Sequence, residues 1–278
     1  MLKKINSSEV KKIKLPNDIE YDKFRGIELI HPYTNTFICG KKHSGKSCVI
    51  NHLLRNTIDK NTKVYIFCST VYNDSSYRAI VDWFQKKEIE YELFTAVIEN
   101  KVDHLKNIVD RLVLEAEQKM LLDQHPESDK PDIDNIPYGV AVVVPDEDDN
   151  IKIKVKKPKK LSPEIVFIFD DMSAQLRNSS SLSVLLKQNR HYKSNVYISS
   201  QNVNDLFPDQ RLQIQYWYVF KGFNSDKFLD IYKSADPSVS FEKFYEMYLI
   251  ATSELYHFFN YNTSKDIYKK DFNYQFIL

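Results

Sequence analysis

Short, nearly continuous apolar runs recur along the chain and are separated by segments in which apolar residues return every three or four positions. Continuous runs of this length are typical of strands buried on both faces of a parallel sheet, and the intervening spacing is typical of amphipathic helices. Alternation of the two predicts a three-layer α/β fold, with a mainly parallel central sheet and helices on both faces. The runs occupy residues 36–39, 64–68, 165–169, 195–200 and 216–220.

Helical spacing is clearest in two places. Apolar residues from Val49 to Ile58 predict a helix directly after the first run, and those from Val102 to Met120 predict an amphipathic helix of about six turns. Between them, residues 91–94 predict a further short strand.

Residues from about 124 to 163 differ in composition, being rich in Pro, Asp and Lys. Within them an apolar run at 140–144 and an alternating segment at 151–155 flank an acidic turn, which predicts an inserted β-hairpin. The Lys-rich residues 1–33 predict a basic N-terminal arm. Residues 34–278 then form the main domain, with a C-terminal extension from about residue 223.

Overall composition excludes some classes of protein. At 42% hydrophobic residues the chain can fill a sizeable core, while a net charge of +1 says little about partners. No apolar run approaches the roughly 18 residues of a membrane span, and the polar start does not resemble a signal peptide, so secretion is not expected. Three cysteines without a Cys-x-x-Cys pair, Cys39, Cys48 and Cys68, predict reduced core residues in an intracellular compartment.

The pattern G-x-x-x-x-G-K-S lies between the first predicted strand and its helix, as expected of a phosphate-binding loop (P-loop). Backbone N–H groups of such a loop surround phosphates at the positive end of the following helix. Lys46 would contact the β- and γ-phosphates of ATP, and the Ser47 hydroxyl would ligate Mg²⁺. The alternative is a chance match in a solvent loop. The loop consists of Gly40, Lys41, Lys42, His43, Ser44, Gly45, Lys46 and Ser47.

Polar residues follow two later strands. Asp170 ends a run of five apolar residues, where a second Mg²⁺ ligand is needed, and Asp171 would orient or activate water. The alternative is a pair that caps the next helix. Gln201 ends the next strand and would sense the γ-phosphate through its neutral amide, unless it is an ordinary strand-end polar residue.

The phosphate loop, the Asp-Asp strand and the strand-ending Gln together resemble the FtsK/HerA superfamily of DNA-pumping ATPases. The resemblance is nearest to the poxvirus-type genome-packaging ATPases of large DNA viruses and virophages. Arg190-His191 ahead of the Gln201 strand and the stretch from Leu206 to Gln213, which contains Arg211, strengthen it. The similarity spans Phe37 to about Lys221 without the insertion.

This resemblance implies a RecA/FtsK-like ATPase that uses ATP and Mg²⁺ and forms a homo-oligomeric ring around double-stranded DNA, with capsid proteins as further partners. It implies a location in the host-cell cytoplasm or viral factory, or in the virion. An arginine from one subunit would stabilise charge on the neighbour's γ-phosphate. Arg190 is the first candidate and Arg211 the second, although each could be a structural ion-pair residue.

Lysines beside the insertion and in the N-terminal arm are the candidates for sequence-independent contacts with DNA phosphates. Solvated charge on a surface loop is the simpler alternative. Beside the insertion these residues are Lys154, Lys156, Lys157, Lys159 and Lys160.

The function that these features favour is ATP hydrolysis coupled to the movement of double-stranded viral DNA into a capsid. A nucleotide kinase shares the phosphate loop but needs an acceptor pocket and lid arginines. A protein that binds ATP without hydrolysing it, and uses it to control assembly, is the non-enzymatic alternative.

Overall fold

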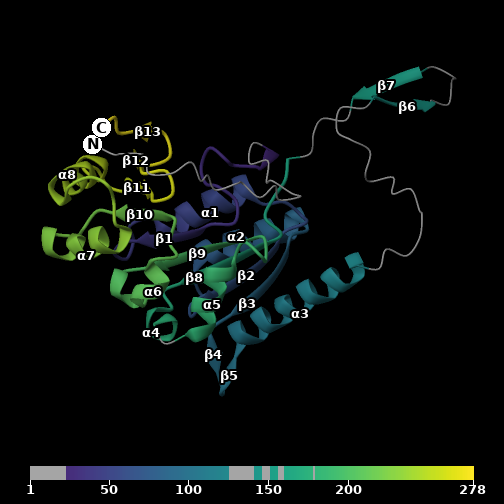
Figure 1. Ribbon diagram of the computed structural model, residues 1–278, viewed down its shortest axis with the longest axis horizontal. Helices are drawn as coiled ribbons and strands as arrows, with labels where there is room; N and C mark the ends of the chain where they lie inside the picture. The colour runs from purple at the N-terminus through teal and green to yellow at the C-terminus, as the bar shows by residue number, and fades with distance from the viewer. Residues whose placement is uncertain (1–22, 125–140, 146–150, 156–159, 178) are drawn as a thin grey trace, which may run out of the picture.

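The structure is a computed structural model that describes residues 23–124, 141–145, 151–155, 160–177 and 179–278. Its centre is a nine-stranded sheet in the order β13-β12-β11-β10-β1-β9-β8-β2-β3 (Figure 1). From β10 to β3 all neighbouring strands pair in parallel, which confirms the predicted mainly parallel sheet. These strands are β1 (Asn35–Cys39), β2 (Lys63–Cys68), β3 (Glu90–Phe94), β8 (Ile165–Asp170), β9 (Ser194–Ser200) and β10 (Tyr216–Phe220).

The C-terminal region continues the same sheet. After β10 the chain forms two helices and then returns to pair antiparallel beside β10, so residues beyond 223 widen the sheet on one side. Figure 1 shows these strands beside the two helices at the C-terminal end of the molecule. The elements are α7 (Ser225–Ala235), α8 (Phe241–Ala251), β11 (Phe258–Asn262), β12 (Ile267–Lys270) and β13 (Tyr274–Gln275).

Helices cover both faces of the sheet because its central strands are apolar on both sides. In β1, Phe37 packs into the core beneath α3, α5, α7 and α8, whereas its neighbour Ile38 packs into the core beneath α1 and α2. This alternation follows from the two-residue period of a strand, and it confirms the three-layer fold. The remaining helices are α1 (Lys46–Thr57), α2 (Ser75–Lys87), α3 (His104–Gln124), α4 (Ser173–Leu176), α5 (Ser180–Gln188) and α6 (Pro208–Arg211), with a 3₁₀ turn at Val203–Asp205.

The predicted long helix begins later than its apolar pattern suggests. Val102 belongs to a small antiparallel pair, β4 (Ile98–Glu99) with β5 (Val102–Asp103), and is largely exposed. The Asp103 carboxylate accepts a hydrogen bond from the Lys106 backbone N–H at 2.8 Å, which caps the amino end of the helix and fixes its start after Asp103. The predicted hairpin of the insertion is confirmed as an antiparallel pair, β6 (Ala141–Pro145) with β7 (Ile151–Val155).

The described part of the predicted N-terminal arm is packed against the domain. Phe24 and Ile30 are buried, and Phe24 forms a β-bridge with Leu161. Residues 1–22 of the predicted arm lie outside the described residues. Among the helices of the described ranges, none combines the length and the apolar character that a membrane crossing requires.

Candidate active site

The order of the strands brings the predicted phosphate loop, the Asp170–Asp171 pair and Gln201 to one edge of the sheet. β9 lies between β1 and β8 and is parallel to both, so the carboxyl ends of all three strands meet. Gly40 follows β1, Asp170 ends β8, and Gln201 follows β9. The Gly40 N–H donates a hydrogen bond to the Ser200 carbonyl oxygen at 3.1 Å, which joins the phosphate loop to β9.

Two glycines are required by the shape of the loop. A Cβ on Gly40 would lie 2.6 Å from Ser44 Oγ and 2.8 Å from Phe220 Cβ, so a side chain there would displace the loop or the β10 strand. Gly45 has a φ of +105° and stands immediately before α1. Since residues with a Cβ are strained in this region, Gly45 lets the loop turn directly into the helix.

Lys46 is the most enclosed side chain of the loop, and only 7% of it is exposed. Its ammonium donates hydrogen bonds to the carbonyl oxygens of Gly40 at 2.9 Å and Lys41 at 3.1 Å. The ammonium is therefore held inside the loop, beside the amino end of α1, whose first turn contains no acidic residue. A helix start of this kind favours anions, so the charges here suit a phosphate. Around it, Lys41, Lys42 and His43 are exposed, and Ser44 and Ser47 are half-buried.

Asp170 is a buried carboxyl group with a defined partner. Only 7% of the residue is exposed, and its Oδ2 accepts a hydrogen bond from the Tyr77 hydroxyl at 2.7 Å. Burial raises the pKa of Asp170, as does the neighbouring charge of Asp171, whereas the Tyr77 hydroxyl and the Lys46 charge act in the opposite direction. A carboxylate whose charge is costly to bury is one that a cation would stabilise.

Mg²⁺ fits this donor set if the nucleotide completes it. Asp170 and Ser47 supply the hard oxygen ligands that Mg²⁺ prefers, and Mg²⁺ in nucleotide sites commonly takes few protein ligands with the rest from phosphate and water. The described ranges contain no group of three or more His, Cys, Asp or Glu residues that could hold a metal. A cation held by Asp170 and Ser47 would therefore take its remaining ligands from phosphate and water.

Asp171 differs from its neighbour because its backbone is left-handed, with a φ of +51°, and its side chain is exposed. Its N–H donates to the Ser199 carbonyl oxygen at 3.1 Å, which holds this conformation against β9. The side-chain amide of Gln201 then donates to Asp171 Oδ1 at 3.3 Å. The helix-capping alternative finds no support, because α4 starts after Met172 without a side-chain cap.

A small polar cluster at this edge was missed from the sequence. Ser200 Oγ donates to the Asp205 carboxylate and lies 3.3 Å from Ser173 Oγ. Tyr77 was missed as well, although it occurs on the apolar face of α2 where a buried hydroxyl needs a partner. The position of Tyr77 on that face could have indicated that its hydroxyl needs a hydrogen-bond partner. It could not have identified Asp170 as that partner.

The first candidate arginine, Arg190, lies at the other edge of the sheet. Arg190 precedes β9, whereas Gln201 follows it, and the seven residues of β9 separate the two by roughly 20 Å. Arg190 is exposed and lines a cavity of about 660 Å³ together with Thr34 and Tyr216, at the amino ends of β1 and β10. Arg190 therefore does not reach the phosphate loop of its own chain.

Arg211 is engaged within its own chain. Its guanidinium donates to the Leu206 carbonyl oxygen at 2.9 Å, to Asn204 Oδ1 at 2.8 Å and to Ser234 Oγ at 3.5 Å. These contacts connect the segment before β10 with α7. The geometry thus gives Arg211 a bracing role and leaves Arg190 as the more available of the two guanidinium groups.

The predicted DNA-contacting lysines fall largely outside the described residues. Lys160 is described and exposed, and Lys154 belongs to β7, but its side chain is not among those described. Lys156, Lys157 and Lys159 lie outside the described residues.

The prediction that all three cysteines are core residues was wrong for Cys48. Cys39 and Cys68 are buried, and burial raises the pKa of both thiols. Cys48 is exposed because it lies in the first turn of α1, immediately after Ser47, on the side that faces solvent.

No protein-family model matches the sequence, and comparison with curated proteins finds no match. Solved structures do resemble the chain. The DNA-packaging ATPase B204 from Sulfolobus turreted icosahedral virus is 19% identical, with 86% of this chain and 97% of that chain covered and a TM-score of 0.49. The genome-packaging NTPase B204 from Sulfolobus turreted icosahedral virus 2 with ATP-gammaS is 17% identical, with coverages of 86% and 96% and a TM-score of 0.45. The pCW3 conjugation coupling protein TcpA is 13% identical, with coverages of 71% and 51% and a TM-score of 0.42. All three TM-scores lie below 0.5.

Proposed function

We propose that this chain is a P-loop ATPase that couples ATP hydrolysis to the movement of double-stranded DNA, as a viral genome-packaging motor. The observation that carries the ATPase part is the convergence of Lys46, Asp170 and the Asp171–Gln201 pair at one sheet edge. Each of these groups was expected for a separate step of phosphoryl transfer, and the strand order places them together.

Lys46 binds the β- and γ-phosphates, exchanging its two loop carbonyl partners for phosphate oxygens. The N–H groups at the start of α1 hold the same phosphates from the other side. Ser47 and Asp170 would hold Mg²⁺, which neutralises charge that develops on the transferred phosphoryl group. Tyr77 keeps Asp170 in position for that task.

Asp171 orients the attacking water and accepts its proton. Its exposed carboxylate stands at the carboxyl end of the sheet, and the hydrogen bond from Gln201 fixes its direction. Because Gln201 follows the strand adjacent to β1, it can contact both Asp171 and the γ-phosphate. Gln201 would thereby link the presence of the γ-phosphate to the position of the base.

The DNA-moving part of the proposal rests on the resemblance of the motif series to DNA-pumping ATPases. In a ring of such subunits, ATP lies at a junction and the neighbour supplies an arginine. Arg190 suits this role, since it is exposed and lies at the edge opposite its own phosphate loop. We place double-stranded DNA as a sequence-independent substrate and a second copy of the chain as a partner, with capsid proteins as the recipients of the DNA.

The test is ATP turnover with and without double-stranded DNA, for the native chain and for Asp171→Asn. Asp82→Asn is the matched control, because Asp82 is an exposed carboxylate on α2. We expect DNA to stimulate turnover in the native chain and in the control, and Asp171→Asn to remove most of it.

The outcomes separate the alternatives. Turnover that requires a nucleoside or nucleotide acceptor would contradict the motor and favour a kinase. ATP binding without turnover under any condition would favour an assembly protein controlled by ATP. Turnover that DNA leaves unchanged would support the proposed ATPase activity and contradict the proposed movement of DNA.

A further inference from the structure

The strand order sets the direction in which a nucleotide lies across the phosphate loop. In the proposed function Asp170 and the Asp171–Gln201 pair act on the γ-phosphate. Both lie on the β9 and β8 side of β1. The opposite side of β1 is occupied by β10 and then β11. A nucleotide with its γ-phosphate toward β8 therefore directs its base toward β10 and β11.

An exposed aromatic residue stands on that side of the loop. A Cβ on Gly45 would lie 3.7 Å from Tyr256 Cδ1 and 3.5 Å from Phe220 Cε1, so both rings lie against the phosphate loop. Phe220 is buried within β10, but Tyr256 is 70% exposed. Among the described residues, no hydrogen bond or aromatic ring engages the Tyr256 side chain, so its ring is available to a ligand.

Tyr256 also has a backbone conformation that a tyrosine seldom adopts. Its φ is +67°, in the left-handed region, where residues with bulky side chains are strained. Strain of this kind persists only where surrounding contacts hold it, and it is concentrated at functional sites.

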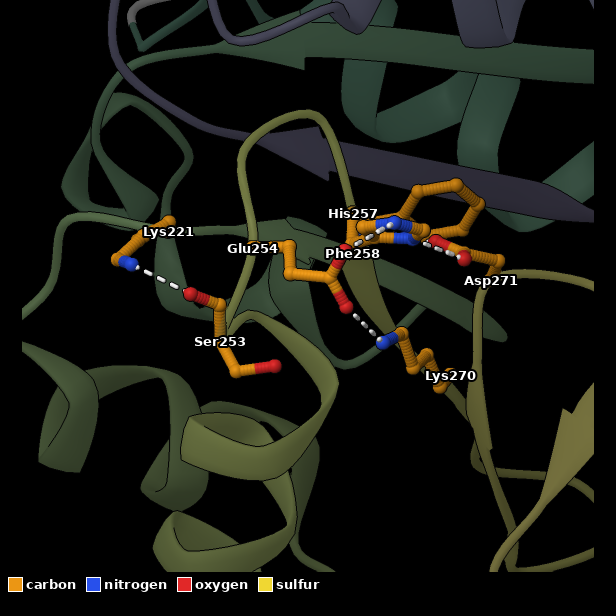
Figure 2. Close-up of polar contacts among 7 residues, drawn as sticks. All are labelled: Lys221, Ser253, Glu254, His257, Phe258, Lys270 and Asp271. Carbon is orange, nitrogen blue, oxygen red and sulfur yellow. Dashed lines mark hydrogen bonds and ion pairs between the residues drawn. The ribbon is translucent and has the colours of Figure 1, made fainter.

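Residues before and after Tyr256 in the sequence make the contacts that hold this backbone. Before Tyr256, the Ser253 carbonyl oxygen accepts a hydrogen bond from the Lys221 ammonium at 2.8 Å, and Glu254 pairs with Lys270 at 3.4 Å (Figure 2). After it, His257 Nδ1 lies 2.5 Å from the Asp271 carboxylate.

The same carboxylate accepts the Phe258 N–H at 3.0 Å. Three of these contacts hold segment 253–257 and the fourth holds Phe258 directly after it; their partners are Lys221 after β10, Lys270 in β12 and Asp271 after β12. Among the described residues, the exposed ring of Tyr256 in this segment has no partner of its own.

The turn after β10 contacts a second part of the phosphate loop, on the same side as Tyr256. The Lys41 side chain packs against Gly222, where an added Cβ would lie 2.9 Å from Lys41 Cε. The phosphate loop, the end of β10 and the segment 253–257 therefore form one continuous surface.

We propose that Tyr256 is the platform on which the base of the bound nucleotide stacks, an inference that rests on the proposed ATPase function. Every nucleobase has an aromatic face, so this contact adds affinity for the nucleoside part without selecting among bases. The ion pairs and hydrogen bonds around segment 253–257 hold the ring in place before the nucleotide arrives, which reduces the entropy lost on binding.

The test compares ATP with inorganic tripolyphosphate, which has the phosphates but no base. Calorimetric dissociation constants for both would be measured in the presence of Mg²⁺ for the native chain, Tyr256→Ala, Tyr256→Phe and Lys46→Ala. Tyr274→Ala is the matched control, because Tyr274 is 68% exposed and lies on β13.

We expect Tyr256→Ala to weaken ATP binding about 10-fold, because alanine substitution of an aromatic residue that stacks on one base has effects of this order. Tripolyphosphate binding should be unchanged, Tyr256→Phe should keep the native affinity for ATP, and the Tyr274→Ala control should behave as the native chain. A tryptophan introduced by Tyr256→Trp should change its fluorescence on addition of ATP and not on addition of tripolyphosphate.

Two results would overturn the inference alone: native ATP affinity in Tyr256→Ala, or equal weakening of ATP and tripolyphosphate. In either case Lys46→Ala would still weaken the binding of both ligands, and the assignment of the phosphate loop as the phosphate-binding site would remain supported. If the native chain binds neither ligand, or if Lys46→Ala changes neither affinity, the proposed function fails and the base platform fails with it.

Discussion

The side-chain amide of Gln201 donates hydrogen bonds to both carboxylate oxygens of Asp171, with N–O distances of 3.3 and 3.5 Å. The two residues are 30 positions apart in the chain and meet because β8 and β9 are neighbours. This contact connects the proposed sensor of the γ-phosphate to the proposed base.

Replacing Gln201 should therefore impair the chemical step more than nucleotide binding. We expect Gln201→Leu to lower kcat about 100-fold, because removing one positioned polar group in a catalytic site has effects of this order. The dissociation constant of ATP should change little. Steady-state kinetics together with calorimetry would measure both, with Gln275→Leu, an exposed site on β13, as the control. Equal losses in binding and turnover would contradict the sensor role.

The stability of the protein should depend on pH through Asp170. Burial raises the pKa of this carboxyl above its ordinary value of 3.8, so the folded state favours the protonated form. This contribution to stability is complete below pH 3.8 and is lost as the pH rises through the raised pKa. Urea unfolding of Asp170→Asn at pH 4 to 7 should show a smaller decline in the free energy of unfolding than the native chain. Parallel curves would contradict this account of Asp170.

Tyr77→Phe should destabilise the site without altering the core volume. The substitution removes only the hydroxyl that donates to Asp170 at 2.7 Å, so the free energy of unfolding should fall by about 1–2 kcal/mol near neutral pH. Half-maximal turnover should also need more Mg²⁺, because Asp170 is less well held. Tyr72→Phe is the control, since Tyr72 is 64% exposed. Native stability and Mg²⁺ dependence in Tyr77→Phe would argue against a supporting role.

Cys48 should be the thiol that reacts first with iodoacetamide. It is exposed, whereas burial both covers Cys39 and Cys68 and raises the pKa of their thiols. Mass spectrometry should find early modification at Cys48 alone, and ATP with Mg²⁺ should slow it, because Cys48 follows Ser47 at the phosphate loop. Modification that ATP leaves unaffected would place the nucleotide away from α1.

Arg190 should act on the nucleotide of a neighbouring subunit. Arg190→Ala should lower turnover about 10³-fold, as loss of an arginine finger does, and Lys46→Ala should also be inactive. Mixing the two variants should restore part of the activity, because some junctions then combine a native Lys46 with a native Arg190. Arg78→Ala, at an exposed site on α2, is the control. If the mixture stays inactive while the subunits associate, Arg190 is not the trans-acting residue.

The sequence by itself determined those features that depend on neighbouring residues. Apolar runs predicted β1, β2, β8, β9 and β10, because a strand buried on both faces needs consecutive apolar side chains. The G-x-x-x-x-G-K-S spacing likewise predicted the loop around Lys46, and the end of the apolar run predicted the position of Asp170.

The tertiary structure alone decided which distant residues meet. The partnership of Tyr77 with Asp170 spans 93 positions, and that of Tyr256 with Gly45 joins the segment before β11 to the phosphate loop. Neither follows from periodicity, since both depend on the order of strands in the sheet. The parallel direction of β9 and β1 placed Arg190 at the opposite edge from the phosphate loop. The orientation of α1 on the sheet left Cys48 exposed to solvent. Local spacing determines the elements of this protein, whereas the contacts of its site come from how those elements are arranged.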